Sequence, residues 1–304
     1  MEIPRVNNLS KENFVENYLK PHEPVIVEDV MSDWDMYRFQ PESLKKEFGN
    51  RLVQVYNDLF DFQHVKTLKD YLEEAFHQLP TRTDCSSYTR WYTKYKEMNF
   101  FWSDDVFEAL KRSWGNPYFL PVDKFIIPFH NGESMHSHES PFPYKGLFIS
   151  GRGARTRLHR DPFYSNAILC QFYGQKEIIL FDPEQKEFLM RQDGTFIDPN
   201  NVPHQFYNQY SQAEYTFKTI LNPGEVIFIP SGWFHDVTSI TDSVSITWNF
   251  VHHYELRSFY NYLKDNPNDP GMETIKYFLR NQLKKDAEIE EIHAFFQKMI
   301  EPSL

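Results

Sequence analysis

The clearest pattern of hydrophobic and polar residues is a series of short apolar segments between Lys145 and about Phe250. These segments are rich in β-branched and aromatic residues, and turn residues such as Gly, Pro, Asn and Asp separate them. Many short strands at this spacing predict a barrel or a sandwich. The expected strands cover residues 146–150, 167–173, 177–181, 215–221, 226–230 and 243–250.

Residues on either side of this stretch follow other patterns. Pro24-Val-Ile-Val-Glu predicts a strand, and residues 68–76 predict an amphipathic helix with Thr67 as its N-cap. After about His252, three apolar stripes at helical spacing replace the strand pattern. We therefore expect an α+β section over 1–144, a β core over 145–251 and a helical region over 252–304. The stripes contain Leu256, Phe259 and Leu263, then Ile275, Phe278 and Leu279, then Ile289, Ile292, Phe295 and Met299.

One connection within the expected β core is long. The stretch from about Gln192 to Glu214 is polar and aromatic and contains two prolines. It separates two expected strands, whereas the turns elsewhere in the core look tight. Because ordered loops of this length often border a binding site, we expect a surface loop with that position.

Composition limits the class of protein. The 304 residues are 40% hydrophobic and 17% aromatic, which predicts a globular chain rather than a disordered one. The sequence has no leader pattern, no apolar run long enough to span a bilayer, and only two cysteines, Cys85 and Cys170, which are far apart. We expect a soluble intracellular protein of a reducing compartment, cytoplasmic or nuclear, with no membrane partner.

The formal net charge of −11 disfavours binding to a nucleic acid backbone. A local exception is the arginine cluster, which consists of Arg152, Arg155, Arg157 and Arg160. These arginines either attract an acidic group of a substrate or belong to a solvated loop, and the solvated loop is the commoner outcome for clustered charges. RNA is therefore a less favoured partner than a protein or peptide.

A metal-binding pattern lies within the expected β core. His159 and Asp161 are two residues apart, so their side chains emerge on the same face of a strand. His235 follows a Pro-Ser-Gly turn at the start of another expected strand and supplies a third donor. Two histidines and a carboxylate form the facial triad of non-haem Fe(II) oxygenases, and zinc is the competing metal. Because His-x-Asp pairs occur often by chance, the prediction depends on all three residues.

Polar residues on two further strands are candidates for a pocket beside this metal. Lys176 shares a strand face with apolar residues, which favours an inward position, although a solvated lysine at a strand end is the commoner case. The last expected strand has a polar stripe that alternates with apolar residues. This stripe either faces a bound polar group or is the solvent face of an edge strand. It consists of Ser243, Ser245, Thr247 and Asn249.

Three sequence blocks resemble, in order, those of the Jumonji C (JmjC), or cupin-8, oxygenases. They are Thr156-Arg-Leu-His-Arg-Asp-Pro, Tyr173-Gly-Gln-Lys and Asn222-Pro-Gly-Glu-Val-Ile-Phe-Ile-Pro-Ser-Gly-Trp-Phe-His. The resemblance covers about 145–250, and the segment from Pro24 to Trp34 is similar to the N-terminal section of this family. It implies a mainly β fold with flanking helices, whose core is a double-stranded β-helix, also called a jelly roll or cupin.

The resemblance also implies roles for individual residues. His159, Asp161 and His235 would bind Fe(II), and O2 would be one cosubstrate. Lys176 would pair with the C5 carboxylate of the other cosubstrate, 2-oxoglutarate. Further residues implied at the 2-oxoglutarate pocket are Thr156, Thr247, Asn249 and Tyr88, with Tyr92 as the alternative tyrosine.

One position departs from the family pattern. Some hydroxylases have an asparagine facing the cosubstrate where this chain has Leu169. Ser165 and Asn166 are the nearest polar residues in the sequence. The departure affects how the cosubstrate would be oriented and leaves the ligand set unchanged.

The implied activity is that of an iron- and 2-oxoglutarate-dependent dioxygenase. The chain is nearer to the small hydroxylase-type members than to the histone demethylases, which usually carry accessory domains. We therefore predict hydroxylation of an amino-acid side chain in a protein or peptide. The alternatives are an oxygenase acting on a modified RNA base or a small molecule, and a non-catalytic cupin-like binding protein. The apolar stripes of the C-terminal helices also predict a homodimer.

Overall fold

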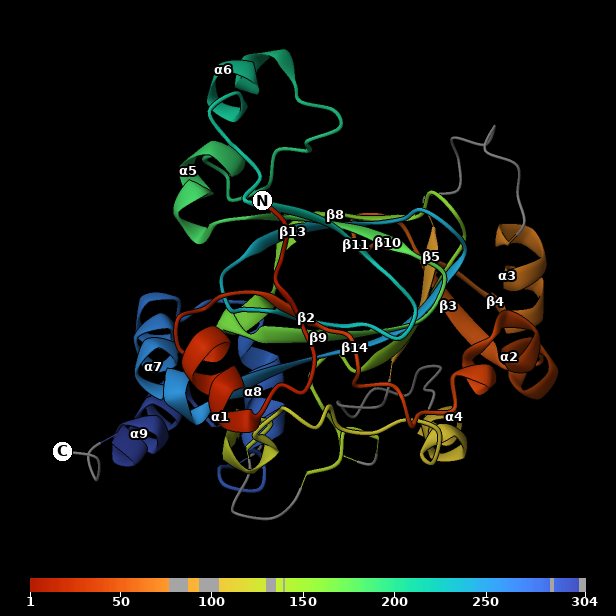
Figure 1. The fold of residues 1–304 in the computed structure, drawn as a ribbon. Coiled ribbons are helices and arrows are strands. Elements are labelled where there is room, and N and C mark those ends of the chain that lie inside the picture. The colour runs from red at the N-terminus through yellow and green to blue at the C-terminus, as the bar shows by residue number, and fades with distance from the viewer. Residues whose placement is uncertain (77–86, 93–103, 130–134, 139, 285–286, 301–304) are drawn as a thin grey trace.

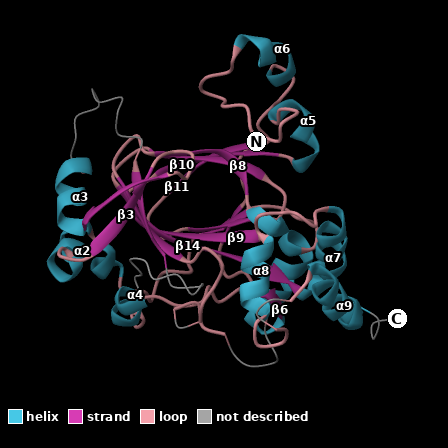
Figure 2. Cartoon of the chain, turned by 180° about the vertical axis from the view of Figure 1, so that it is seen from behind, coloured by secondary structure: helices cyan, strands magenta, loops and turns pink. Residues whose placement is uncertain are grey.

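Two facing β-sheets form the centre of the molecule, and helices flank them (Figures 1 and 2). The structure is a computed structural model that describes residues 1–76, 87–92, 104–129, 135–138, 140–284 and 287–300. Within these residues the two sheets remain separate and do not close into a barrel. The core is therefore a jelly-roll sandwich, in agreement with the predicted fold class.

The larger sheet has ten strands in the order β1-β2-β12-β9-β14-β7-β5-β3-β4, and β6 pairs with β14. Its central strands are buried on both faces, because helices and loops cover the side that faces away from the smaller sheet. The strands are β1 (Arg5–Val6), β2 (Val25–Val27), β3 (Leu52–Tyr56), β4 (Phe62–Thr67), β5 (Tyr88–Tyr92), β6 (Phe125–Ile127), β7 (Gly146–Ser150), β9 (Asn166–Tyr173), β12 (Val226–Ile229) and β14 (Ser243–His252).

The smaller sheet has four strands in the order β11-β10-β13-β8. Burial alternates along β11, where Phe217, Thr219 and Leu221 are buried and the residues between them are exposed. The inward residues of this sheet share a hydrophobic cluster with inward residues of the larger sheet, such as Leu169. The strands are β8 (Arg155–Arg160), β10 (Lys176–Phe181), β11 (Phe217–Leu221) and β13 (Phe234–Ser239).

The first 144 residues contribute strands to the same sheet as the predicted β core. β12 pairs with β2, and β5 pairs with β7, so segments from both stretches lie side by side. One large hydrophobic cluster contains residues of both stretches, including Phe14 and Phe228, whose ring centroids are 4.9 Å apart. The division at residue 144 is therefore one of sequence pattern, and the packing is continuous across it.

Helices cover the ends of the sheets. Thr67 caps α3 by accepting a hydrogen bond from the main-chain NH of Asp70 (3.1 Å), as its sequence position predicts. Two short helices, α5 and α6, project from the end of the smaller sheet, and α6 lies within the predicted 192–214 loop (Figure 1). The helices are α1 (Lys11–Phe14), which continues as a π-helix (Val15–Leu19), α2 (Pro41–Phe48), α3 (Leu68–Ala75), α4 (Asp104–Leu110), α5 (Lys186–Leu189), α6 (Tyr207–Tyr210), α7 (Leu256–Asp265), α8 (Met272–Leu279) and α9 (Ile289–Ile300).

The C-terminal helices pack their apolar stripes within the chain. Phe259 of α7, Ile275 of α8 and Phe296 of α9 are fully buried in one cluster that also contains Ile127 of β6. The stripes on which the predicted homodimer depends are thus largely covered by the chain itself. In the described parts of the chain, no helix is both long enough and apolar enough to cross a membrane.

The strand predictions agree with the structure to within two residues at each end. The predicted strand 215–221 begins at Phe217, and the one predicted over 243–250 continues to His252. The edge-strand interpretation of the last strand is wrong, because β14 pairs with β9 on one side and with β7 on the other. Its polar stripe therefore faces the space between the sheets, and its apolar residues belong to the main core.

Candidate metal centre and cosubstrate pocket

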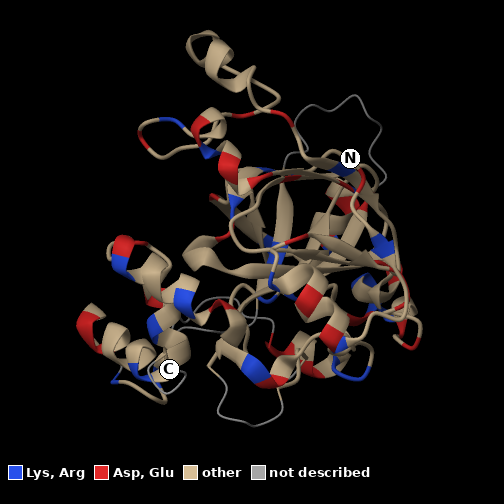
Figure 3. Ribbon diagram, turned by 60° about the vertical axis from the view of Figure 1, so that its left-hand side comes forward, with Lys and Arg blue, Asp and Glu red and all other residues tan. Residues whose placement is uncertain are grey.

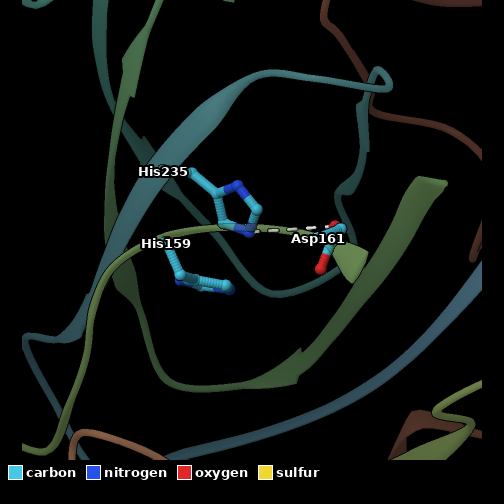
Figure 4. A group of neighbouring side chains, drawn as sticks. All are labelled: His159, Asp161 and His235. Atoms are coloured by element: carbon cyan, nitrogen blue, oxygen red, sulfur yellow. Dashed lines mark ion pairs between the residues drawn. The ribbon is translucent and has the colours of Figure 1, made fainter. Parts of the chain in front are cut away.

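Three of the predicted residues lie together between the sheets. His159 is on β8, Asp161 follows the end of β8, and His235 is on β13. The two histidines are directly opposite each other on paired strands, with ring centroids 4.0 Å apart. Nε2 of His235 is 3.9 Å from Oδ2 of Asp161, and the ligand atoms of all three residues lie within 4.8 Å of one another (Figure 4). One metal ion can therefore contact all three side chains.

A β-bulge in β8 brings a fourth polar residue to the same side. His159 is opposite His235, and Thr156 is opposite Val237, so two residues of β8 lie across from one residue of β13. In a regular strand, residues three apart point to opposite faces. Because the bulge adds one residue between them, His159 and Thr156 point to the same face of the sheet, and both line the same cavity.

Hydrogen bonds to main-chain carbonyls orient both imidazole rings. Nδ1 of His159 donates to the carbonyl oxygen of Arg157 (2.8 Å), and Nδ1 of His235 donates to that of Trp233 (3.1 Å). Because a carbonyl oxygen only accepts, each Nδ1 carries the proton and each Nε2 keeps its lone pair. Such contacts at the second ring nitrogen are typical of metal-binding histidines.

Burial sets the charge state of the cluster. It lowers the pKa of His159 well below the ordinary value, and neighbouring His235 lowers that pKa further. Neutral imidazole is the form that binds metal. Burial also raises the pKa of Asp161, against the opposing effects of His235 and of a hydrogen bond with Asn249. The poorly hydrated carboxylate would be stabilised by a divalent cation.

A cavity of about 330 Å³, here called the metal cavity, opens beside the three residues. Most of its wall is apolar, and both sheets contribute to it, with Leu169 from β9, Ile229 from β12 and Val237 from β13. Asp161 is the one acidic residue in its wall among the described residues. Its size suits a small organic ligand.

Lys176 lies inward on β10, as its strand alternation predicts. Only 6% of its surface is exposed, and its Nζ donates to Oγ of Ser245 (2.9 Å). Burial, with a smaller contribution from the Arg90 charge, lowers the pKa of Lys176 to about 7. Lys176 lines a narrow recess, here called the lysine recess, and Phe148 and Val237 line both this recess and the metal cavity. Lys176 therefore lines a different space from the metal ligands, and the side chains of Phe148 and Val237 form the wall between the two spaces.

The two candidate tyrosines take different places. Tyr88 lines the lysine recess, and its hydroxyl is hydrogen-bonded to the side chain of Thr156. Tyr92 lines the metal cavity together with Thr156. Tyr88 is thus the tyrosine beside Lys176.

β14 and β9 form the wall opposite the histidines. Oγ1 of Thr247 donates to a main-chain carbonyl of β9 (2.7 Å), and Nδ2 of Asn249 donates to Oγ of Ser165 (3.1 Å). Both side chains line the metal cavity. Leu169 lines it too, whereas Asn166 is fully buried and binds a glutamate behind the strand. Ser165 and Asn166, the nearest polar residues to Leu169 in the sequence, are not among the described residues that line this cavity.

Comparison with known families identifies the fold. A family model described as a cupin-like domain matches residues 11–256, which include all the strands that surround the metal cavity. The chain belongs to the cupin-like domain family. The resemblance to JmjC, or cupin-8, proteins is thereby confirmed, and it extends beyond the 145–250 stretch into the N-terminal section.

Several curated proteins are similar to this cupin-like chain. The 2-oxoglutarate and iron-dependent oxygenase JMJD4 of Gallus gallus is 22% identical over 289 residues, which cover 86% of this chain and 63% of that protein. The arginine-specific demethylase JMJ20 of Arabidopsis thaliana is 26% identical over 291 residues, covering 84% and 58%. The lysine-specific demethylase 8 of Xenopus tropicalis is 24% identical over 260 residues, covering 81% and 52%. The matched region is thus between about half and two thirds of each relative.

Arg90 and Phe60 also belong to this cupin-like site, although no sequence motif indicated them. Arg90 on β5 lines the metal cavity and is 6% exposed, and Phe60 lies in the loop between β3 and β4. The Phe60 ring is 4.9 Å from the His159 ring and 3.6 Å from the Arg90 guanidinium. Alternation along β5 places Arg90 on the same face as Tyr88 and Tyr92, and this signal could have identified it.

The predicted arginine cluster is not a solvated loop, because most of it forms β8. The guanidinium of Arg155 binds both carboxylate oxygens of Asp236, and Nε of Arg157 is 2.6 Å from Oδ2 of Asp58. Arg160 lines the metal cavity. Basic and acidic residues are interspersed along the ribbon, which shows no continuous basic stripe in this view (Figure 3). The charges of Arg155 and Arg157 are therefore neutralised locally.

Proposed function

We propose that this chain is an Fe(II)- and 2-oxoglutarate-dependent dioxygenase that hydroxylates an amino-acid side chain of a protein or peptide. The main support is the cluster of His159, Asp161 and His235, in which one ligand atom from each side chain lies within 4.8 Å of the others. Two histidines and one carboxylate leave three coordination positions open, which suits Fe(II) with two cosubstrates better than a closed structural zinc site. The oxygenase JMJD4 is a named relative with this dependence.

Different residues would bind the metal at one end of the site and the distal carboxylate of 2-oxoglutarate at the other. His159, Asp161 and His235 would hold iron, and Lys176 would pair with the C5 carboxylate of 2-oxoglutarate, beside the hydroxyl of Tyr88. When bound, iron and 2-oxoglutarate would use O2 to couple decarboxylation of 2-oxoglutarate to succinate and CO2 with hydroxylation of a substrate C–H bond.

The wall of the metal cavity would orient the cosubstrate and keep water out. The hydroxyl of Thr156 and the amide of Asn249 would orient 2-oxoglutarate, and the hydroxyl of Thr247 would do so after turning away from the main-chain carbonyl of Ile168. The apolar side chains of Leu169 and Ile229 would exclude water from the reacting groups.

A protein or peptide is the substrate class that the molecule supports best. The names of two relatives, an arginine-specific and a lysine-specific demethylase, refer to amino-acid side chains. The net charge of −11 and the pairing of Arg155 and Arg157 with carboxylates disfavour an RNA backbone. The cytoplasmic or nuclear location and the homodimer through the C-terminal helices stay parts of the proposal. Because the chain itself covers most of the apolar stripes, the dimer would depend on their partly buried residues, such as Phe295 and Met299. Light scattering at micromolar concentration tests the dimer.

The test is formation of succinate from 2-oxoglutarate by the purified protein with added Fe(II). We expect iron-dependent turnover that a peptide pool stimulates more than an RNA pool does. Asp161→Ala should abolish it, because two ligands hold Fe(II) poorly. Asp193→Asn, which changes an exposed carboxylate that accepts from Thr195, is the matched control and should retain turnover.

Each other outcome has a clear meaning. Full turnover by Asp161→Ala would show that the ligand assignment is wrong. Stimulation by RNA alone would favour the nucleic acid alternative. Absence of iron binding and of turnover in the parent protein would favour a non-catalytic cupin-like binding protein.

A further inference from the structure

Arg90 is a buried cation between the two ends of the proposed site. It is in the middle of β5, directly opposite Phe148 of β7. Its surface is 6% exposed, and it contributes to the wall of the metal cavity. The Phe60 ring covers one face of its guanidinium at 3.6 Å. Arg90 thus faces the ligand space and is shielded from bulk water.

The polar contacts of Arg90 are incomplete. Nη1 donates to the hydroxyl of Tyr92 (2.8 Å), and Nη2 donates to the hydroxyl of Tyr88. Nε is buried and has no hydrogen-bond partner among the described residues. In those same parts of the chain, no carboxylate forms an ion pair with Arg90 or with Lys176. A buried charge without a counter-ion is costly, so the arrangement indicates that an anionic ligand completes it.

Arg90 and Lys176 flank the same aromatic ring. The Arg90 guanidinium is 5.5 Å and the Lys176 ammonium is 5.9 Å from the centroid of Phe148, which lines both the metal cavity and the lysine recess. The two cations also share Tyr88, which accepts a hydrogen bond from Arg90 and lines the lysine recess. They therefore concentrate positive potential at one place, and repulsion between them contributes to the low pKa of Lys176.

We propose that Arg90 is a second cation for the distal carboxylate of the 2-oxo dicarboxylic acid, acting with Lys176 and held in place by Phe60 and the two tyrosines. This inference rests on the proposed function, because it assumes that 2-oxoglutarate enters the site. The carboxylate has two oxygens and several lone pairs, so it can accept from both an ammonium and a guanidinium. Arg90 would thereby determine the specificity of the site for a dicarboxylate over a monocarboxylic 2-oxo acid.

The decisive experiment compares two ligands of equal chain length. 2-Oxoglutarate and 2-oxovalerate are each titrated into the anaerobic Fe(II) protein, and the metal-to-ligand charge-transfer absorption reports binding. In Arg90→Gln, we expect the affinity for 2-oxoglutarate to fall about ten- to a hundredfold, as for loss of a charged hydrogen bond. The affinity for 2-oxovalerate, which lacks the distal carboxylate, should stay within about twofold.

Arg280→Gln is the matched control. Arg280 also lies 3.6 Å from an aromatic ring, that of Tyr277, and it is exposed in the C-terminal helical region. Its replacement should alter neither affinity. Arg90→Lys keeps the charge but loses the planar fork, so it should recover part of the preference for 2-oxoglutarate.

A second measurement does not depend on whether Arg90→Gln folds. In Lys176→Ala, Arg90 remains, so a reduced preference for 2-oxoglutarate over 2-oxovalerate should persist. Equal affinities for both ligands in Lys176→Ala would overturn the proposal. An equal loss of both affinities in Arg90→Gln, with iron still bound, would assign Arg90 a purely structural role, and no loss would exclude it from the pocket. Failure of the parent protein to bind 2-oxoglutarate would instead refute the proposed function.

Discussion

The two sheets contribute to the site in different ways. The central strands of the larger sheet are buried on both faces, and β9 and β14 are almost wholly inaccessible to solvent. The smaller sheet is buried on its inner face, while its outer face is partly exposed, as the alternation along β11 and β10 shows. Yet β8, β10 and β13 of the smaller sheet carry the two histidines and Lys176, and Asp161 follows β8. The candidate chemistry is thus on the sheet with less apolar burial.

Ion pairs on the outer face help to hold the smaller sheet in place. Arg155 of β8 binds Asp236 of β13 across the strands, and its Nη1 is 2.8 Å from Oδ1 of Asp198 in the 192–214 loop. These side chains are nearly buried, with exposures of 11%, 5% and 16%. Both sheets contribute apolar side chains to the packing between them, and the outer face of the smaller sheet adds specific charge pairs. These pairs connect β8 to β13 and to the 192–214 loop, close to the metal ligands.

Removal of Lys176 should produce the largest change in cosubstrate binding. Lys176→Ala would leave the distal carboxylate of 2-oxoglutarate poorly neutralised in a dry recess, at a cost of about 2–5 kcal/mol in binding free energy. Iron binding should survive, because the lysine is separated from the ligands. Charge-transfer titration under anaerobic conditions measures both quantities.

The matched control for Lys176 is Lys218→Ala, on the outer face of the same sheet. Lys218 pairs with Glu177 at 2.9 Å, but its side chain is 47% exposed. Lys218→Ala should leave the affinity for 2-oxoglutarate unchanged. Equal affinities of Lys176→Ala and the parent would show that the inner face of this sheet does not bind the cosubstrate.

Loss of Arg155 tests whether ion pairs stabilise the smaller sheet. Arg155→Met should lower the free energy of unfolding by about 3 kcal/mol, because Asp236 is left buried and unpaired. Arg155→Met with Asp236→Leu should recover much of this loss, since no charge remains to be desolvated. Urea denaturation measures each value.

An exposed ion pair beside the larger sheet should contribute much less to the free energy of unfolding than the Arg155 pair does. Lys45 pairs with Glu73 at 3.1 Å, with exposures of 30% and 49%. Lys45→Met should change the free energy of unfolding by less than about 1 kcal/mol. A comparable loss in both variants would contradict the special role of ion pairs in the smaller sheet.

The pH dependence of binding, taken per pH unit, should be smaller than the effect of removing Lys176. The pKa of Lys176 in the free protein is about 7. Above that pH, binding of 2-oxoglutarate must be accompanied by uptake of a proton, so its affinity should fall by up to about tenfold per pH unit. Below pH 7 the ammonium is already present, and the affinity should be nearly constant. The slope should disappear in Lys176→Ala, and its persistence there would assign the titration to another group.

Stability of the free protein should depend on pH in the opposite sense. Between pH 7 and the ordinary lysine pKa of 10.5, the unfolded chain binds more protons at this position than the folded protein does. The free energy of unfolding contributed by Lys176 therefore rises with pH in this window. Thermal melting of the parent and of Lys176→Ala, across that window, measures the difference.

Local patterns in the sequence predicted the elements well, and they failed where distant strands decide the outcome. Alternation located β10 and placed Lys176 inward. It could not show which face of β14 lines the space between the sheets, because the neighbouring strands β7 and β9 come from other parts of the chain. The bulge between Thr156 and His159 was missed for a similar reason, since it exists only in the pairing with β13. Arg90 was missed because a single arginine on a short strand carries no motif.

Because of the bulge in β8, residues on the outer face of the strand can change without a change in the residues on its inner face. The two residues that it accommodates point outward: Arg157 pairs with Asp58 of the β3–β4 loop, and Leu158 packs in the cluster of Leu189 on α5. In-frame loss of the Leu158 codon would leave Thr156 and His159 two residues apart, still on one face of a regular strand. We therefore expect a chain without Leu158 to lose an outer anchor while keeping the metal ligands on one face, which titration of that variant with Fe(II) would test.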